Sequence, residues 1–289
     1  MTGDWRFESG LKWRPLMPFG AELDIDLSAP LPEPAAARFV SLLWQSSLLL
    51  ARHQSLTMQR QQQLMGLLGP ILQRAGENGY ISTETGQEVS LSELPFHADA
   101  AYTTAPFDSL SLHAVDVVDG SSSTRFASAQ RAHDALSPAL LEQLAAHRVE
   151  MISPGFETLS RRTCQIRDPK AMKRGELPSV QINPHNGGSC LWVSEMQAAR
   201  LLGMEWEASG ALLGAVFDRL YAPDNVYEHV WQQGDIVIWD KIALQHARGS
   251  LKGVGKRVLQ RVIVGTEGVC PHIGPAVDTP AGEAPAVNM

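Results

Sequence analysis

The stretch LPFHADAAYTT, from Leu94 to Thr104, contains the only His-x-Asp or His-x-Glu triplet in the chain, formed by His97 and Asp99. On an extended strand, residues two positions apart project to the same face because side chains alternate with period two. One imidazole and one carboxylate would then face a common point. With 9 His and 31 acidic residues in 289, roughly one such triplet is expected by chance. A surface turn with a capping aspartate is the competing interpretation, so the triplet needs further support.

A third ligand for a metal at this point has to come from far along the chain. The candidate is His246, in the run DIVIWDKIALQHARG that ends at Gly249. Two histidines and one carboxylate on one face of a metal, with the opposite face open, are typical of non-haem Fe(II) oxygenases. A zinc hydrolase or a redox-silent metal-binding module could use the same three ligands. Both kinds of site remain open from the ligand types alone.

Composition excludes several classes of protein. The formal net charge is -7 and the isoelectric point is about 5.7, whereas a nucleic-acid or anionic-membrane surface needs clustered positive charge. The three widely spaced cysteines, Cys164, Cys190 and Cys270, give neither a disulfide framework nor a zinc-ribbon signature. The first ten residues lack the build of a signal peptide, and no apolar run is as long as a membrane span. We expect a cytoplasmic protein with no nucleic-acid or membrane partner.

The remaining sequence predicts alternating helices and strands within one domain, residues 1–268, followed by a loosely ordered tail, 269–289. The clearest predicted elements are a helix from Glu33 to Gln45, a buried strand from Leu48 to Arg52, and strands at Leu110 to Val117 and Lys256 to Gly265. Less regular patterns predict a single helix over 128–146, a loop over 78–93 and a helical MQAARLLGM segment. Residues 150–180 are expected to form an irregular, basic insertion, either a solvated face or a lid over a site.

The chain resembles the TauD/TfdA family of Fe(II)- and 2-oxoglutarate-dependent dioxygenases from about Gly20 to Glu267. Six segments carry the resemblance, in the family's order: GAELDIDLSAPL, FHADAAY, GSSSTRFAS, LWVSEMQAARLLGM, QQGDIVIWDKIALQHARG and RVLQRVIVG. The resemblance implies a mainly β fold with flanking helices, a double-stranded β-helix or jelly-roll of the cupin type. It also implies that His97, Asp99 and His246 are the iron ligands and that O2 is the oxidant.

The resemblance further assigns the cosubstrate and substrate contacts. The family anchors the distal carboxylate of 2-oxoglutarate with an arginine and a threonine, which are assigned here to Arg261 and Thr124. An arginine suits that role because its planar fork of donors matches a carboxylate. Arg257 lies four positions from Arg261 and therefore on the same face of the strand, where it is expected to meet the substrate. Both arginines could equally be ordinary strand-surface charges.

The substrate is expected to be a small, anionic organic molecule that is hydroxylated, desaturated or cleaved, with release of succinate and CO2. The alternative is an amino-acid-derived or other natural-product intermediate. Two expected substrate contacts differ from the taurine-oxidising members, because Glu93 stands where they carry asparagine and Phe96 replaces a common tryptophan. Asp99 favours hydroxylation over halogenation, since related halogenases lack this carboxylate. Association into a homo-oligomer stays open.

Overall fold

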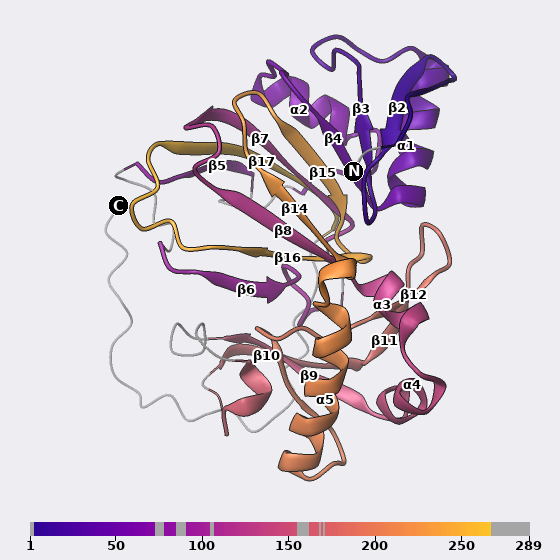
Figure 1. Ribbon diagram of the computed structural model, residues 1–289, viewed down its shortest axis with the longest axis vertical. Coiled ribbons are helices and arrows are strands. Elements are labelled where there is room, and N and C mark those ends of the chain that lie inside the picture. Colours follow the sequence, from indigo (N-terminus) through magenta and orange to yellow (C-terminus); the bar gives the residue numbers. More distant parts are fainter. Residues whose placement is uncertain are drawn as a thin grey trace.

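Two facing β-sheets form the upper part of the protein (Figure 1). A computed structural model describes residues 3–72, 78–84, 91–104, 107–154, 162–167, 169 and 171–266. The major sheet has eight strands in the order β1-β2-β3-β4-β15-β7-β17-β5, and the minor sheet has four in the order β14-β8-β16-β6. The major-sheet strands are β1 (Arg6–Glu8), β2 (Leu11–Pro15), β3 (Ala21–Leu23), β4 (Leu48–Ala51), β5 (Gly79–Ser82), β7 (Ser109–Val117), β15 (Ile236–Asp240) and β17 (Arg257–Val264). The minor-sheet strands are β6 (Leu94–His97), β8 (Ser123–Ser128), β14 (Val226–Val230) and β16 (Leu244–Arg248).

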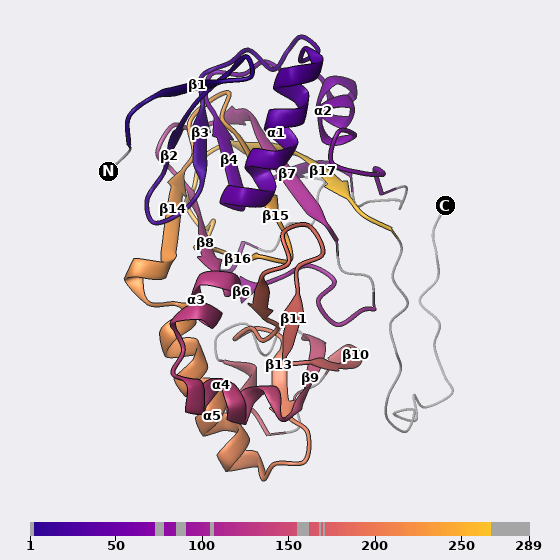
Figure 2. The same ribbon diagram turned by 90° about the vertical axis from the view of Figure 1, so that its right-hand side faces the viewer.

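Alternation along the strands divides the core into two layers. On β17, Leu259 and Ile263 face the minor sheet, whereas Val262 and Val264 pack on the opposite side of the major sheet. That outer side is covered by α1 (Glu33–Ser46) and α2 (Met58–Met65), which Figure 2 shows beside the major sheet. The space between the two sheets is therefore an interior lined by every second residue of each strand.

The lower part of the protein contains the remaining helices and two small sheets (Figures 1 and 2). Its helices are α3 (Ala129–Ala135), α4 (Pro138–Ala145) and α5 (Trp206–Leu220), with 3-10 turns at Thr163–Gln165 and Pro223–Asn225. Its strands are β9 (Arg148–Pro154), β10 (Ala171–Pro178) and β13 (Ala198–Leu201), which form one sheet, and β11 (Val180–Ile182) with β12 (Ser189–Leu191), which form a hairpin. Within the described residues, no helix has the length and apolar character needed to cross a membrane.

Several predicted elements are confirmed, among them α1, β4, β7 and β17. The single helix predicted over 128–146 is wrong, because Pro138 holds the preceding Ser137 in an extended conformation and Ser137 caps a second helix. The predicted loop over 78–93 contains the edge strand β5.

Two further predictions failed because long-range strand pairing overrode the local pattern. The described parts of the 150–180 segment are not irregular, since its two ends form the antiparallel pair β9 and β10. The segment MQAARLLGM contains β13, which pairs with β9 instead of forming a helix. The helix preference of alanine and leucine amounts to less than about 1 kcal/mol per residue, similar in size to other local effects. Hydrogen bonding to the edge of β9 therefore decides the conformation. The predicted tail, 269–289, lies outside the described residues.

Candidate metal centre

The centre forms where β6 and β16 pair in the minor sheet. His97 and His246 are directly opposite each other in this antiparallel pair, and their ring centroids are 4.3 Å apart. On β16, Leu244 belongs to the core between the sheets, so His246, two positions later, faces the same interior. Strand pairing thus brings together two imidazoles from segments far apart in the sequence.

Asp99 reaches the same point from a turn and not from a strand, which corrects one expectation. Strand β6 ends at His97, and residues Asp99 to Tyr102 form a turn in which Ala100 has a φ of 58°. One carboxylate oxygen, Asp99 Oδ1, lies 3.4 Å from His97 Nε2. Adjacent ligands at right angles, each about 2.1 Å from a metal, are roughly 3 Å apart, so this spacing suits a shared ion.

Two contacts fix the backbone that carries these ligands. Nδ1 of His97 lies 2.8 Å from the carbonyl oxygen of Pro95, which requires Nδ1 to carry the proton and leaves Nε2 as the lone-pair donor. The side-chain amide of Gln197 clamps Ala98, accepting from its N–H at 3.0 Å and donating to its carbonyl at 2.9 Å. The segment between the two ligands is therefore held on both sides.

The protonation states of the ligands suit a divalent cation. Each of His97, Asp99 and His246 offers one donor atom, and the three atoms lie within 4.8 Å of one another. Burial, reinforced by Lys241 and His97, holds the pKa of His246 well below its usual value. Burial alone would raise the pKa of Asp99, but Lys241 and then His246 lower it well below 3.8. A neutral imidazole and an ionised carboxylate are the forms that bind metals.

Thr124 lies on the interior face of β8 and is 2% exposed. Its Oγ1 accepts a hydrogen bond of 3.0 Å from the indole Nε1 of Trp231. Because the indole can only donate, the hydroxyl proton of Thr124 remains available for an acceptor. The residue is thus set up as a donor, which suits the expected carboxylate contact.

Arg257, the first residue of β17, is a buried cation that is 2% exposed and lies next to β8, the strand of Thr124. Its Nε donates to Oγ of Ser122 at 3.2 Å, and Ser122 is two residues before Thr124. Among the residues that the structure describes, no carboxylate lies within ion-pair distance of this guanidinium. Burial, together with the nearby Arg248, lowers the pKa of Arg257 to about 10. A buried cation of this kind needs an anionic partner.

Arg261 lies four residues further along β17, on the same interior face as Leu259 and Ile263. The backbone pairing shifts by one residue between Val258 and Leu259, but the extra residue belongs to β7, so the alternation along β17 continues. Burial lowers the pKa of both His246 and Lys241, and the positive charge of Arg261 adds to this effect in each case. Both predicted arginines therefore face the interior, and Arg261 is electrostatically coupled to the metal centre.

The two other predicted substrate contacts lie on the opposite face of the minor sheet. Phe96 stacks on Tyr221 with ring centroids 4.4 Å apart, and the guanidinium of Arg125 lies 5.4 Å from the Phe96 ring centre. Glu93 is exposed and lies 3.4 Å from Arg125. The structure does not bring these two residues into the space that contains the three ligands. Phe96 instead supports the strand that carries His97.

The sequence reasoning missed three residues of this centre: Lys241, Gln197 and Trp231. Their roles depend on hydrogen bonds between segments far apart in the chain, so no local pattern marks Gln197 or Trp231. Lys241 carried one signal, because it forms with Asp240 a charged pair inside a mostly apolar run five residues before His246. Inside a protein core, a buried charge requires a partner.

The fold and the three ligands define a jelly-roll protein with a facial His/Asp/His metal centre. The taurine dioxygenase of Burkholderia xenovorans superposes with a TM-score of 0.74 at 21% identity, covering 90% of this chain and 93% of that chain. AAD-2, solved in complex with Mn(II) and N-oxalylglycine, gives a TM-score of 0.70 at 20% identity, covering 88% and 97%. These structures confirm the predicted fold.

Sequence comparison gives the family. Pentalenolactone F synthase of Streptomyces arenae is 24% identical over 196 residues, and the match spans 62% of this chain and 65% of that protein's own length. The model of the taurine catabolism dioxygenase TauD, TfdA family matches residues 12–263. The chain belongs to this family, whose 2-oxoglutarate-dependent dioxygenases use Fe(II), 2-oxoglutarate and O2. The ligand set described above fits such an ion.

Proposed function

We propose that the protein is an Fe(II)- and 2-oxoglutarate-dependent dioxygenase that oxidises a C–H bond of a small organic anion. For hydroxylation, the substrate, 2-oxoglutarate and O2 give the alcohol, succinate and CO2, with one oxygen atom entering each of the alcohol and succinate. Desaturation or oxidative cleavage uses the same two-electron oxidation. Iron, when bound, supplies the activation of O2, and the protein fixes distance and orientation.

One observation carries this proposal. His97, Asp99 and His246 converge in the space between two sheets whose interior faces also present Thr124 and two arginines. A zinc hydrolase could use the same ligands, but the family to which the chain belongs needs a second anion site for its cosubstrate, and the donor Thr124 beside the buried Arg257 supplies one. The combination suits a metal that shares its site with a dicarboxylate cosubstrate.

The surroundings of the two arginines favour an exchange of the roles expected from the sequence, which gave Arg261 to the cosubstrate and Arg257 to the substrate. Thr124 is the other expected anchor, and Arg257 is tied to its strand through Ser122. Trp231 bonds to both parts of this cluster, with its backbone N–H donating to the Ser122 carbonyl and its indole to Thr124. We therefore assign the distal carboxylate of 2-oxoglutarate to Thr124 and Arg257, and the substrate anion to Arg261.

An anionic substrate is supported by the position of Arg261. The cosubstrate brings two negative charges, one directed to the metal and one to Arg257. Arg261 lies on the same interior face of β17, and its positive charge adds to the burial that lowers the pKa of His246 and of Lys241. A carboxylate, sulfonate or sulfate ester group would bind it through two parallel hydrogen bonds. The resemblance to the taurine dioxygenase fold is in keeping with this class, though Glu93 and Phe96 depart from the taurine-oxidising pattern.

Oxidation of a natural-product intermediate is the second candidate. It is favoured by the similarity to pentalenolactone F synthase, which the chain matches over 196 residues. The two candidates make different demands on Arg261, because a neutral or weakly charged intermediate does not need that cation near the metal.

Succinate release distinguishes these candidates. Iron-loaded protein is incubated with 2-oxoglutarate and O2, alone and with each compound of two panels. One panel contains aliphatic and aryloxy carboxylates, sulfonates and sulfate esters, and the other contains amino-acid derivatives and terpenoid lactones. The proposal expects stimulation of succinate release, matched by oxidised product, from the first panel. Stimulation only by the second panel would favour the natural-product role, and the absence of oxygen uptake in the iron-loaded protein with every compound would refute the oxygenase assignment.

A further inference from the structure

Lys241 is a buried lysine in the turn between β15 and β16, the two strands that lead to His246. Its side chain is 1% exposed, and Nζ lies 3.0 Å from Asp99 Oδ2. The partner of this lysine is therefore the carboxylate that we assign to the metal. An ordinary structural ion pair would not use a metal ligand as its acid.

The turn that carries Lys241 is held rigidly. The Oδ1 atom of Asp240 accepts from the backbone N–H groups of Ile242 at 2.8 Å and Ala243 at 3.1 Å, and its Oδ2 accepts from Asn183 at 2.7 Å. The backbone N–H of Lys241 itself donates to the carbonyl of Asp108 at 3.0 Å. The lysine thus projects from a fixed backbone toward a fixed target.

The two carboxylate oxygens of Asp99 have different partners. Oδ1 lies 3.4 Å from His97 Nε2, on the side of the imidazole pair, whereas Oδ2 lies 3.0 Å from the lysine ammonium. We propose that Lys241 is a positioning residue that keeps Oδ2 off the metal, so that Asp99 supplies a single ligand atom. This inference rests on the metal centre of the proposed function.

A single ligand atom from Asp99 matters for the positions left open. An ion held by these three protein donors would need its remaining positions for the 2-oxo acid and for O2. A chelating carboxylate would occupy one of these positions. Lys241 therefore preserves an open position, and outer partners of metal ligands commonly have this orienting role.

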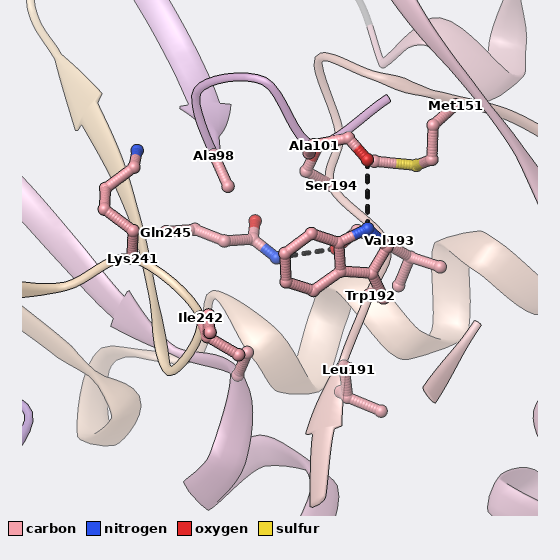
Figure 3. A pocket seen from close by; sticks show the side chains of 11 residues that line it. Ala98, Ala101, Met151, Leu191, Trp192, Val193, Ser194, Lys241, Ile242 and Gln245 are labelled. Carbon is pink, nitrogen blue, oxygen red and sulfur yellow. Dashed lines mark hydrogen bonds between the residues drawn. The ribbon is translucent and has the colours of Figure 1, made fainter. Parts of the chain in front are cut away.

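The surroundings of Lys241 strengthen its hold on Asp99. Its stem lines a small cavity with Ala98, Ala101 and Ile242, and the cavity's polar side chains are already engaged. Figure 3 shows Gln245 bonded to the carbonyl of Val193 and Trp192 bonded to that of Ala101, while the lysine ammonium extends on the side of Ala98. Because the other cavity residues are apolar or, like Gln245 and Trp192, already hydrogen-bonded, the ammonium of Lys241 bonds to Asp99.

Cobalt(II) substitution tests this inference without relying on turnover. Visible absorption spectra and binding titrations are compared for the wild type, Lys241→Met, Lys241→Gln and Lys241→Arg, each prepared with cobalt. Methionine removes the ammonium at similar length, and glutamine is too short by one bond to reach Oδ2. Both are expected to shift the ligand-field spectrum, because Asp99 is then free to bind cobalt through both oxygens, and to raise the cobalt affinity, because a positive charge beside the site is removed. Arginine, which keeps charged donors, is expected to restore the wild-type spectrum.

The outcomes separate a positioning role from a structural one. Unchanged spectra and affinities in folded Lys241→Met or Lys241→Gln overturn the inference, whatever their thermal stability, because a purely structural lysine would affect folding alone. If the methionine variant does not fold, the glutamine variant provides the same test. Lys252→Met, at an exposed position, serves as the matched control. A wild type that binds no cobalt would refute the metal centre itself, which is a separate failure.

Discussion

His97 on β6 and His246 on β16 are paired across the minor sheet with ring centroids 4.3 Å apart. This pairing places two histidines that are far apart in the sequence next to each other. Asp99 completes the centre, with its Oδ1 3.4 Å from His97 Nε2. The turn after β6, clamped by Gln197, then delivers the carboxylate. The metal centre is thus a consequence of strand register, because a slip of β6 by one residue against β16 would turn His97 to the outer face and leave His246 inside.

Asp99→Ala should abolish 2-oxoglutarate decarboxylation, because it removes one of three metal ligands. Succinate release and bound iron are measured together, and both should fall to background. Asp134→Ala, which changes a carboxylate that is 68% exposed on α3, is the control and should leave both unchanged. Decarboxylation that persists in chelator-treated, metal-free wild type would contradict the iron assignment.

Arg257→Leu and Arg261→Leu should affect different kinetic constants. If Arg257 holds the cosubstrate, its loss should raise the KM for 2-oxoglutarate about 100-fold, since a buried charge partner is removed. Arg261→Leu should instead raise the KM for the organic substrate and leave that for 2-oxoglutarate within a few-fold. The opposite pattern would restore the assignment made from the sequence.

Trp231→Phe should weaken cosubstrate binding through Thr124. The variant keeps an aromatic ring but removes the indole N–H that orients the threonine hydroxyl. A single hydrogen bond contributes about 1 kcal/mol, so the KM for 2-oxoglutarate should rise by about fivefold. Trp13→Phe is the matched control, because the indole N–H of Trp13 has no partner among the described residues. Equal effects of both substitutions would argue against the role of Trp231.

Stability should decline in mild acid, in part because of His113. Burial lowers the pKa of His113 below 6.5, and the contacts with the Gln54 carbonyl and Asp235 oppose this only partly. The unfolded chain therefore takes up a proton near pH 6.5 while the folded state does not. The free energy of unfolding consequently falls as the pH drops below that value, by at most about 1.4 kcal/mol per pH unit from this residue.

Urea unfolding at about pH 7.5 and pH 5.5 checks this effect. His113→Gln, which does not titrate, should lose less stability between the two pH values than the wild type. Because His113 is largely neutral in both the folded and the unfolded chain at the higher pH, the difference should appear only on acidification. An identical pH dependence in the two proteins would show that His113 is protonated in the folded state.

The parts of the site that could be predicted are those carried by short local patterns. His97 and Asp99 are two residues apart, and His246 follows a strongly apolar strand, so the family's pattern reveals all three. The jelly-roll itself follows from the resemblance, and the comparisons with solved structures confirm it. The arginines on β17 were predicted to share a face, and the alternation of the other β17 residues between the two core layers agrees.

The missed features depend on contacts that no local pattern encodes. Phe96 was expected at the substrate, but strand alternation directs it to the outer face, opposite to its neighbour His97. Lys241 follows Asp240 in the sequence, and only the fold brings it to Asp99 instead. Strand β13 follows from pairing with β9 in spite of its helix-favouring residues.

Anaerobic titration of the metal-free protein with Fe(II) and then 2-oxoglutarate tests the central claim most directly. The account predicts one iron per chain and, on addition of 2-oxoglutarate, the visible charge-transfer band of an iron-chelated 2-oxo acid. His246→Ala should abolish both. Failure of the wild type to bind iron, or a bound iron that gives no such band with 2-oxoglutarate, would contradict the account.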